Sequence, residues 1–287
     1  MKAAQPGANI RRAGEDVRRG TTVMGQGTAL GPAQIGVLAS LGRATARVYR
    51  RPMIAILSTG DELLDVGEPV APGKIYDSNA YSVASMVREA GGVPKRLGIA
   101  SDTVEALTAK LREGLDADML ITSAGVSRGD YDVVKDVLAK EGEVDFWTVR
   151  MRPGKPLAFG AFPASGGQAS GSRRVPHIGL PGNPVSSMIT FELFGRPAVF
   201  KMLGKSGWER PRVRAVAEER IVNSDGRRVY ARAILTQRGG RHYASLTGPQ
   251  GSGILTSMAL ANALAVVPED VPAIEPGDEV ECIVLSP

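Results

Sequence analysis

The chain has 287 residues, enough for about two domains at roughly 150 residues each. Hydrophobic residues make up 43% and charged residues 23%, an ordinary globular mixture that excludes wholesale disorder. A single cysteine and two histidines exclude an intramolecular disulfide, a multi-cysteine zinc site and a histidine-rich metal centre. We therefore expect any bound metal to be a hard cation held by carboxylates and phosphate, Mg²⁺ before zinc.

The charge and hydropathy patterns restrict the class of partner. No run of about 18 apolar residues is present, and the amino-terminal residues lack the apolar stretch of a signal peptide, so we expect a soluble, cytoplasmic protein that enters no membrane. The net charge of +5 is concentrated in residues 1–52, which hold nine Lys and Arg against two acidic residues. Aromatic residues make up only 5% and are not interleaved with these arginines, so we do not expect a nucleic-acid partner.

Three regions follow one another along the chain. Residues 1–52 are predicted to form a partial, β-rich segment with short strands and one small helix, which begins at Pro32 and stops at Gly42. Residues 206–287 show a period near two with turn signals between the apolar runs, which predicts a small C-terminal β domain. In that domain we expect Cys282 to lie on an edge strand.

Between residues 53 and 205, strand patterns alternate with helical ones. The apolar run at 53–57 is typical of a strand covered on both faces, and further strands are expected near 94–99, 119–121, 144–150, 156–161 and 175–180. Helices are expected at about 79–90, capped by Ser78 or Asn79, after the cap residue Asp102, and from Pro184 to an interruption at Pro197. This alternation predicts a three-layer α/β domain.

Polar loops follow three of the predicted strands, at the edge of the sheet where open α/β folds bind ligands. They contain hydroxyl groups, glycines and backbone amides near helix starts, which suit an anionic ligand. They also contain carboxylates, which repel a phosphate unless Mg²⁺ lies between the two. The candidates in these loops are Ser58, Thr59, Asp61, Glu62, Ser123, Gly125, Ser127, Asp130, Asp132, Pro181, Asn183 and Pro184.

A fourth segment, residues 152–156, places Arg152 and Lys155 on a proline-stiffened turn that suits an oxyanion. Simpler structural roles remain open for several candidates. Asp102 and Asp130 also suit helix caps, and Ser58 and Thr59 also suit turns. Outside the loops, we expect His177 to be a core residue and Glu192 to face solvent.

Four segments resemble the molybdopterin molybdenumtransferase family of the MoeA type, which includes the E-domain of gephyrin. These segments are STGDEL at 58–63, SAGVSRGDYD at 123–132, MRPGKPLAFG at 151–160 and GLPGNPVSS at 179–187. NIRRAGEDVRRG at 9–20 and GPQGSGILTSMALANAL at 248–264 are also similar. The resemblance covers about residues 8–287 and implies that the α/β domain binds molybdopterin.

The resemblance implies the last step of molybdenum cofactor synthesis. Such enzymes bind adenylylated molybdopterin, use Mg²⁺, release AMP and insert molybdate. Carried over by residue, Asp61 and Asp130 are the expected metal ligands, and Glu62, Asp130, Asp102 and Asp16 the expected catalytic carboxylates. Arg152 and Lys155 would hold phosphate or molybdate, Ser127 would offer a hydroxyl, and residues 181–184 would shape the pocket wall.

The sequence departs from the family pattern in two places. Ala124 stands where the family usually has glycine, and we expect the chain to lack a substantial region that precedes the GEDVRRG-like segment in the family. That region helps to build an elongated dimer, so the resemblance also implies a homodimer, with a molybdopterin adenylyltransferase as a further partner.

Two alternatives to the molybdate-inserting enzyme stay open. The first is a non-catalytic module that binds pterin or a partner protein, for which pterin would bind but molybdate would release no AMP. The second is a molybdopterin adenylyltransferase, which shares the α/β domain and would consume ATP.

Overall fold

A computed structural model describes residues 3, 5–123, 131–164 and 173–285, which belong to two compact units, residues 1–49 and 50–287. In the first unit, helix α1 (Pro32–Ser40) begins at Pro32 as predicted, and Gly42 follows its end in the left-handed conformation. The predicted short strands do not form among the described residues of this unit. No neighbouring strand is present there to pair with their backbone groups.

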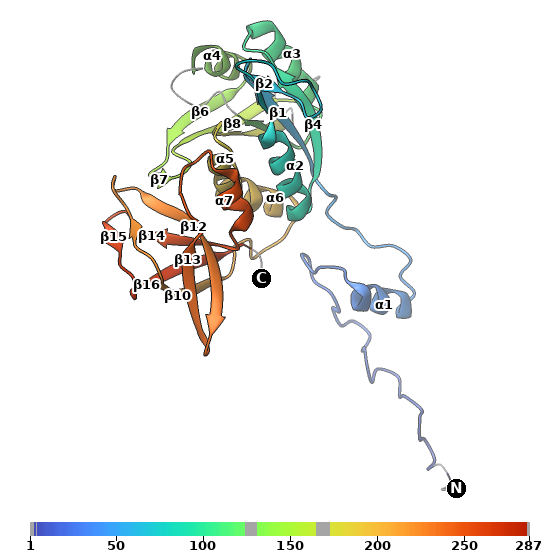
Figure 1. The fold of residues 1–287 in the computed structure, drawn as a ribbon. Helices are drawn as coiled ribbons and strands as arrows, with labels where there is room; N and C mark the ends of the chain where they lie inside the picture. Colours follow the sequence, from blue (N-terminus) through green and yellow to red (C-terminus); the bar gives the residue numbers. More distant parts are fainter. Residues whose placement is uncertain (1–2, 4, 124–130, 165–172, 286–287) are drawn as a thin grey trace. The chain divides into compact units, whose positions relative to one another are not determined.

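The second unit contains a six-stranded sheet in the order β4-β1-β5-β9-β8-β6. Figure 1 labels β4, β1, β8 and β6 of this sheet. The first four strands are parallel, β8 is antiparallel to β9, and β6 is antiparallel to β8. Their bounds are β1 Met53–Thr59, β4 Val93–Ala100, β5 Met119–Ser123, β6 Glu143–Thr148, β8 Pro156–Pro163 and β9 Arg174–Leu180. The carboxyl ends of β1, β5 and β9 therefore lie side by side, which brings together the three polar loops that follow them.

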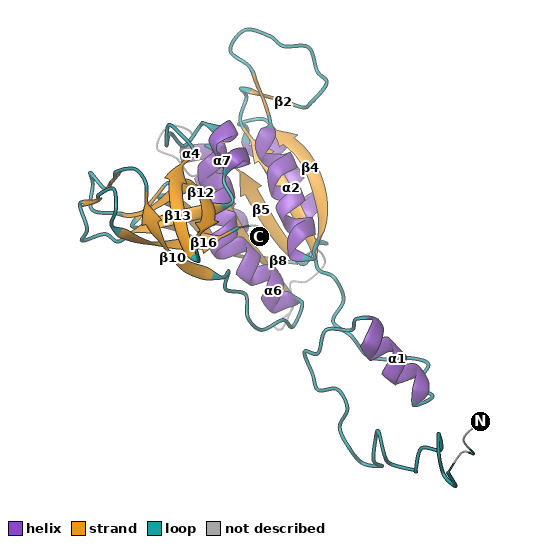
Figure 2. Cartoon of the chain, turned by 60° about the horizontal axis from the view of Figure 1, so that its bottom comes forward, coloured by secondary structure: helices purple, strands orange, loops and turns teal. Residues whose placement is uncertain are grey.

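Helices cover both faces of this sheet (Figure 2). One face packs against α2 (Ser78–Ala90), α5 (Pro184–Thr190) and α6 (Arg196–Met202), and the other against α3 (Val104–Gly114) and α4 (Tyr131–Glu141). A hydrophobic core lies on each face of the sheet, and alternate residues of β1 pack into one or the other. Ile54 and Ile56 face α2, whereas Ala55 and Leu57 face α3. The predicted three-layer α/β architecture is confirmed.

Two predicted helix caps are wrong. Helix α2 is capped by Asp77, whose Oδ1 accepts a hydrogen bond of 3.0 Å from the Ala80 backbone N–H, and not by Ser78 or Asn79. Helix α3 is capped by Thr103, whose hydroxyl oxygen accepts from the Ala106 N–H at 3.3 Å. Each true cap lies one residue from the predicted one, and this shift leaves Asn79 and Asp102 available for other contacts.

The helix that begins at Pro184 changes its winding before Pro197, where an interruption was predicted. Residues Phe191–Gly195 form a π-helical turn, η1, between α5 and α6. Proline has no N–H to donate, and its ring clashes with the preceding turn of an α-helix, so a wider turn accommodates it without ending the helix.

The second sheet of this unit closes on itself as a five-stranded barrel in the order β13-β10-β16-β14-β12, with β13 pairing with β12. Its interior consists largely of alanine and valine, because so narrow a barrel has room only for small side chains. Cys282 is fully buried on β16, between β10 and β14, so its predicted place on an edge strand is wrong. The strands are β10 Arg212–Ala217, β12 Arg228–Arg238, β13 Arg241–Leu246, β14 Ala263–Val267 and β16 Glu279–Val284.

Short elements complete this unit. Helix α7 (Leu255–Leu260) lies beside β12, and β11 (Ile221–Val222) pairs with β15 (Ala273–Ile274). The pair β2 (Leu63–Leu64) and β3 (Ile75–Tyr76) follows β1. Strand β7 (Met151–Arg152) precedes β8 in the chain but pairs with β12 of the barrel. None of the helices in the described ranges has the length and apolar character needed to cross a bilayer.

Candidate functional site

A cleft of about 560 Å³ lies at the carboxyl ends of the parallel strands and includes residues of the barrel. Loop residues predicted from the sequence line it, as do residues that the sequence analysis did not single out. The predicted lining residues are Glu62, Ser123, Arg152, Lys155, Pro181 and Asn183; the additional ones used below are Asn79, Arg227, Gln250 and Ser252.

The loop after β1 is held by a reciprocal contact with the loop after β4. The Asp61 backbone N–H donates to Asp102 Oδ2 at 3.3 Å, and the Asp102 N–H donates to Asp61 Oδ1 at 3.1 Å. Both carboxylates are thus engaged within the loops and do not line the cleft. Glu62 does line it. Gly60 has a φ of +142°, a conformation that side chains rarely adopt, and a Cβ there would meet the carboxylate of Glu62.

Ser58 and Thr59, at the end of β1, are buried and are not part of the cleft lining. Ser123, at the end of β5, does line the cleft and accepts a hydrogen bond of 2.8 Å from Asn79 Nδ2. The same Nδ2 donates to the Gly182 carbonyl oxygen at 2.7 Å. Asn79 therefore ties the start of α2 to two loops of the site. Sequence reasoning missed this role because it treated Asn79 as a candidate helix cap.

The loop after β9 forms another wall of the cleft. Asn183 precedes α5 as its cap residue without a side-chain cap bond, and Pro184 is the first helical residue. Pro181 and Asn183 line the cleft, whereas Pro184 is not in the lining. The Val185 N–H donates to the Ser252 carbonyl oxygen at 3.1 Å, so this loop is joined directly to the barrel.

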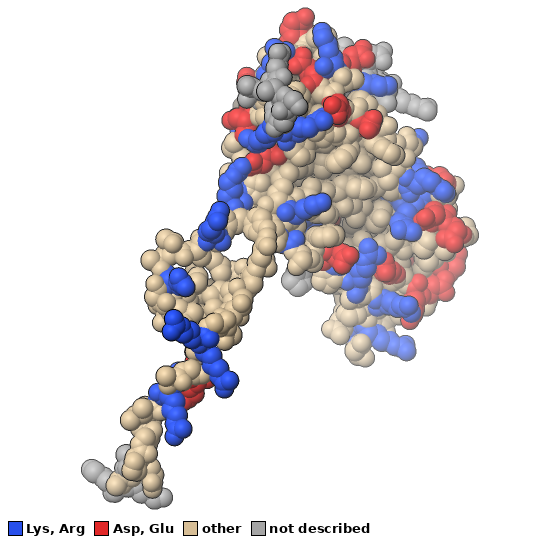
Figure 3. Space-filling model, turned by 180° about the vertical axis from the view of Figure 1, so that it is seen from behind, with Lys and Arg blue, Asp and Glu red and all other residues tan. Residues whose placement is uncertain are grey.

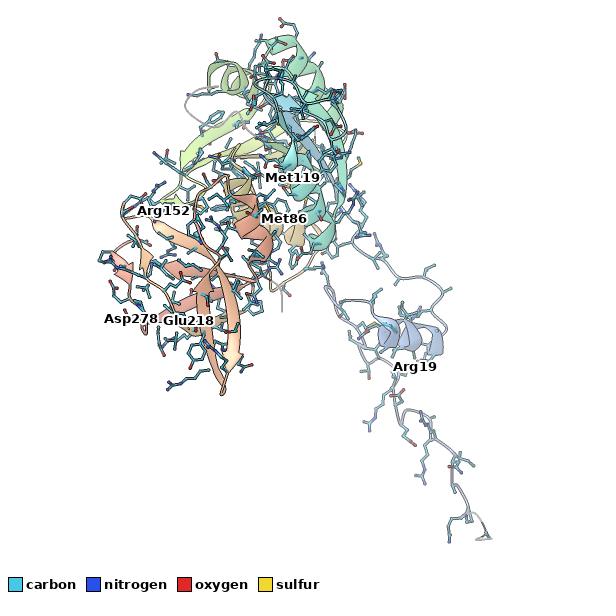
Figure 4. All side chains as sticks on the ribbon, in the orientation of Figure 1. Arg19, Met86, Met119, Arg152, Glu218 and Asp278 are labelled. Atoms are coloured by element: carbon cyan, nitrogen blue, oxygen red, sulfur yellow. The ribbon has the colours of Figure 1, made fainter. Side chains whose placement is uncertain are left out.

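The turn at 152–156 brings positive charge to the cleft. The Arg152 guanidinium donates to Ser224 Oγ at 3.0 Å and to the Val222 carbonyl oxygen at 2.7 Å, and it lies 3.7 Å from Asp225 Oδ2. Figure 4 labels Arg152 at this junction of the α/β sheet with the barrel. Lys155 is exposed, and no described carboxylate lies within ion-pair distance of its ammonium group. Its charge is therefore available to an anionic ligand.

A buried arginine positions the part of the barrel that lines the cleft. Arg232 is fully buried on β12 and donates to the carbonyl oxygens of Pro249, Gln250 and Gly251 at 3.2, 3.0 and 2.9 Å. Burial lowers the pKa of Arg232 from its ordinary value. These bonds fix the loop that carries Gln250 and Ser252. Sequence reasoning noted the family-like segment 248–264 but assigned no residue in it a role.

Several predicted site residues are not tested by this geometry. Four of the residues discussed above lie outside the described residues: Gly125, Ser127, Asp130 and Ala124, the last of which differs from the glycine usual in the family. Asp16 belongs to the other compact unit, residues 1–49, and is exposed there.

The described residues offer little for a metal ion on their own. Among them no group of three or more Asp, Glu, His or Cys side chains is placed to hold one. Glu62 is the carboxylate that the described part of the chain contributes to the cleft lining. A divalent cation bound there would need oxygen ligands from elsewhere, such as the phosphate groups of a ligand and water.

Family models match all three regions of the chain. The model of a probable molybdopterin binding domain matches residues 55–201, and that of the MoeA C-terminal region (domain IV) matches residues 214–285. The model of the MoeA N-terminal region (domain I and II) matches residues 1–42. The fold and these matches thus define the class of protein: an α/β domain of the probable molybdopterin binding family joined to a small barrel.

Curated relatives narrow this class. The chain is 39% identical to molybdopterin molybdenumtransferase 2 of Mycobacterium tuberculosis and 35% identical to the molybdopterin molybdenumtransferase of Haemophilus influenzae, over 97% and 96% of its length. A solved structure of a MoeA protein from Pyrococcus horikoshii matches 96% of the chain, with 28% identity and a TM-score of 0.77. The chain belongs to the molybdopterin molybdenumtransferase family, and its role lies in molybdenum cofactor biosynthesis. It spans 67% of the length of these two curated relatives and 64% of the chain of known structure.

Proposed function

We propose that the cleft binds adenylylated molybdopterin and that the chain inserts molybdate into it with release of AMP. The observation that carries this proposal is the Lys155 ammonium, which no carboxylate of the described residues neutralises, in a cleft built largely by a probable molybdopterin binding domain. The curated relatives that share this domain are named molybdopterin molybdenumtransferase. In this proposal residues 53–205 provide most of the cleft, and the barrel domain, residues 206–287, provides the remainder.

The charges of the cleft suit the proposed reaction. Cleavage of the bond to the adenylyl group develops negative charge on the departing AMP phosphate, and molybdate is itself an anion. Lys155 and Arg152 line the cleft and would stabilise these charges. Arg152 keeps its hydrogen bonds to Ser224 and Val222, so its guanidinium is already oriented when the anion arrives.

Replacing Lys155 with alanine tests the proposed function. We expect Lys155→Ala to lower the molybdate-dependent rate of AMP release by roughly a hundredfold, because a preorganised charge near the developing oxyanion is lost. Lys201→Ala is the matched control, since Lys201 is an exposed lysine of α6 that does not line the cleft. AMP release is measured with purified chain, adenylylated molybdopterin and Mg²⁺, with and without molybdate.

The outcomes of this assay separate the three candidate functions. Molybdate-dependent AMP release by the wild-type chain supports the proposal. Binding of adenylylated molybdopterin without AMP release favours the non-catalytic module. Consumption of ATP in the presence of molybdopterin favours the adenylyltransferase. Equal rates in Lys155→Ala and the wild type would remove Lys155 from the site.

We also propose that Mg²⁺ binds with the substrate, through phosphate oxygens and carboxylates from the set Asp61, Glu62 and Asp130. Glu62 is the member of this set that lines the cleft. When bound, Mg²⁺ would neutralise phosphate charge beside this carboxylate. Glu62→Gln should weaken binding of Mn²⁺, used as a paramagnetic probe, by about tenfold in the presence of substrate. Unchanged Mn²⁺ affinity, relative to the exposed control Glu105→Gln, would exclude Glu62 as a ligand.

Two partner assignments accompany this proposal. We propose that the chain works in the cytoplasm as a homodimer and receives its substrate from a molybdopterin adenylyltransferase. The motif resemblance supports both assignments. Light scattering on the purified chain tests the dimer, and co-sedimentation with a purified adenylyltransferase tests the second partner.

A further inference from the structure

The side-chain amide of Asn79 donates two hydrogen bonds to described residues and accepts none from them. Its side chain is only 8% exposed, and it lines the cleft at the first turn of α2. The two N–H groups of its amide are matched by two acceptors, Ser123 Oγ at 2.8 Å and the Gly182 carbonyl oxygen at 2.7 Å. Its carbonyl oxygen Oδ1 is buried and has no hydrogen-bond partner among the described residues.

The orientation of this amide is fixed by its neighbours. Amide nitrogen and oxygen are assigned from their partners, and a backbone carbonyl can only accept a hydrogen bond. Because the Gly182 carbonyl lies 2.7 Å from one end of the amide, that end must be Nδ2. Oδ1 is therefore the other end, and turning the amide over would set two acceptors against each other.

A buried carbonyl without a partner is energetically unfavourable and is uncommon in folded proteins. A ligand that brings an N–H or O–H group to Oδ1 would remove this cost. A phosphate or molybdate oxygen would not, because an oxyanion brings only acceptors. Arg152 and Lys155 bring cationic groups to the lining of the cleft, whereas Asn79, which also lines it, is uncharged.

We propose that Asn79 is a specificity residue of this site, whose Oδ1 accepts a hydrogen bond from an N–H or O–H group on the uncharged part of the substrate. This assignment rests on the proposed function, because it takes adenylylated molybdopterin as the ligand. Two parts of that molecule carry such donors, the pterin ring and the nucleoside. Asn79 Oδ1 would accept a hydrogen bond from a donor on either part, but it would not bind an oxyanion.

Dissociation constants measured by calorimetry without molybdate test this assignment. We expect Asn79→Ala to weaken binding of adenylylated molybdopterin roughly five- to tenfold, as the loss of one buried hydrogen bond predicts. The control is Ser82→Ala, which removes a hydroxyl donating to the Asn79 backbone carbonyl at 3.2 Å and should bind as the wild type does.

The affinity of the Asn79→Ala variant decides the outcome. If it binds as tightly as the wild type, Asn79 only ties the loops together and the assignment is overturned. Failure of the wild-type chain to bind the ligand would overturn the proposed function, and with it the assignment to Asn79.

Partial ligands identify the source of the donor. Loss of affinity for molybdopterin but not for AMP would locate the donor on the pterin; the reverse would locate it on the nucleoside, and either supports the assignment. A measurement on the wild-type chain avoids any folding defect of the variants. With asparagine labelled by ¹³C at Cγ, the Asn79 signal should move downfield on addition of ligand. An unmoved signal under saturating ligand would overturn the assignment.

Discussion

His177 lies fully buried on β9, where its Nε2 is 3.0 Å from Thr122 Oγ1 and its ring meets Phe162 edge-on. The expectation of a core histidine is confirmed. Burial disfavours the charged imidazolium and lowers the pKa of His177 from 6.5 to about 3. Between these two pKa values the unfolded chain binds a proton that the folded chain does not bind. Stability therefore falls as the pH is lowered through this range.

This linkage gives a prediction for acid sensitivity. Lowering the pH from 7 to 5 should reduce the free energy of unfolding by about 2 kcal/mol through His177 alone. Urea unfolding at several pH values measures the slope. His177→Gln should flatten it over this interval, whereas His242→Gln, which changes a histidine of β13 that is not fully buried, serves as the control. A slope unaffected by His177→Gln would contradict the buried neutral imidazole.

Cys282 gives a second prediction at this scale. Burial in the barrel raises the pKa of the thiol from 9.0 to about 11, so the reactive thiolate is scarce at neutral pH. We expect a disulfide reagent at pH 8 to modify the native chain at least a hundredfold more slowly than the urea-unfolded chain. Absorbance of the released thiol follows the reaction. Rapid modification of the native chain would mean that β16 is accessible.

At the scale of single residues, sequence patterns identified those whose chemistry is local. Glu62 and Lys155 were predicted from their own loops, and both line the cleft. Asn79 was missed because its partners Ser123 and Gly182 lie 44 and 103 residues away in sequence. Glu192 was expected to face solvent, and this expectation is wrong, since its side chain is buried. Its position in an apolar helix does not reveal that Arg210 contacts it.

At the scale of elements, Glu192 joins the π-helical turn to its neighbours. Its side chain is 3% exposed, accepts from Arg196 Nε at 2.6 Å and from Arg210 Nε at 2.8 Å, and raises the pKa of Arg210. Arg210 also donates to the Leu285 carbonyl oxygen at 2.8 Å. The helix containing η1 is thereby linked both to the start and to the end of the barrel region.

Removing the charge of Glu192 should be strongly destabilising. We expect Glu192→Gln to lower the free energy of unfolding by about 3 kcal/mol, because two guanidinium groups lose their buried counter-charge. The matched control is Glu89→Gln. Glu89 also contacts Arg210, at 3.0 Å, but is 65% exposed and should contribute less than about 1 kcal/mol. Urea unfolding compares the two variants, and equal effects would contradict the role of burial.

The elements themselves were predictable to different degrees. The start at Pro184 and the change before Pro197 followed from the covalent limits of proline, which act wherever the residue stands. The caps Asp77 and Thr103 were each missed by one residue, because Asp, Asn, Ser and Thr all satisfy a cap by the same chemistry. Neighbouring residues of this kind compete, and only the local backbone conformation decides between them.

At the scale of the whole molecule, none of the described residues of the N-terminal unit is buried. Helix α1 has no buried residue, and basic side chains are spread along the N-terminal unit, as Figure 3 shows. We expect residues 50–287, prepared without this unit, to unfold cooperatively within about 3 °C of the full chain. Calorimetry measures both samples. A loss of cooperativity or a much lower transition would show that the unit supports the rest of the chain.

The molecule's larger organisation was only partly predictable. The parallel sheet followed from buried apolar runs such as residues 53–57, whose pattern depends on being covered on both faces. The closure of the barrel depends on the parallel pairing of β10 with β13, and no local signal marks such a pairing. The predicted division at residues 205 and 206 stays a prediction.

Strand β7 has a mechanical consequence for the cleft. Met151 and Arg152 pair with Arg228 and Val229 of the barrel, although they stand in sequence between two strands of the α/β sheet. The chain therefore passes from the sheet to the barrel and back before it finally enters the barrel region. A rotation of the barrel about that final connection would have to break this pairing of β7 with β12. The pairing therefore opposes a change in the width of the cleft.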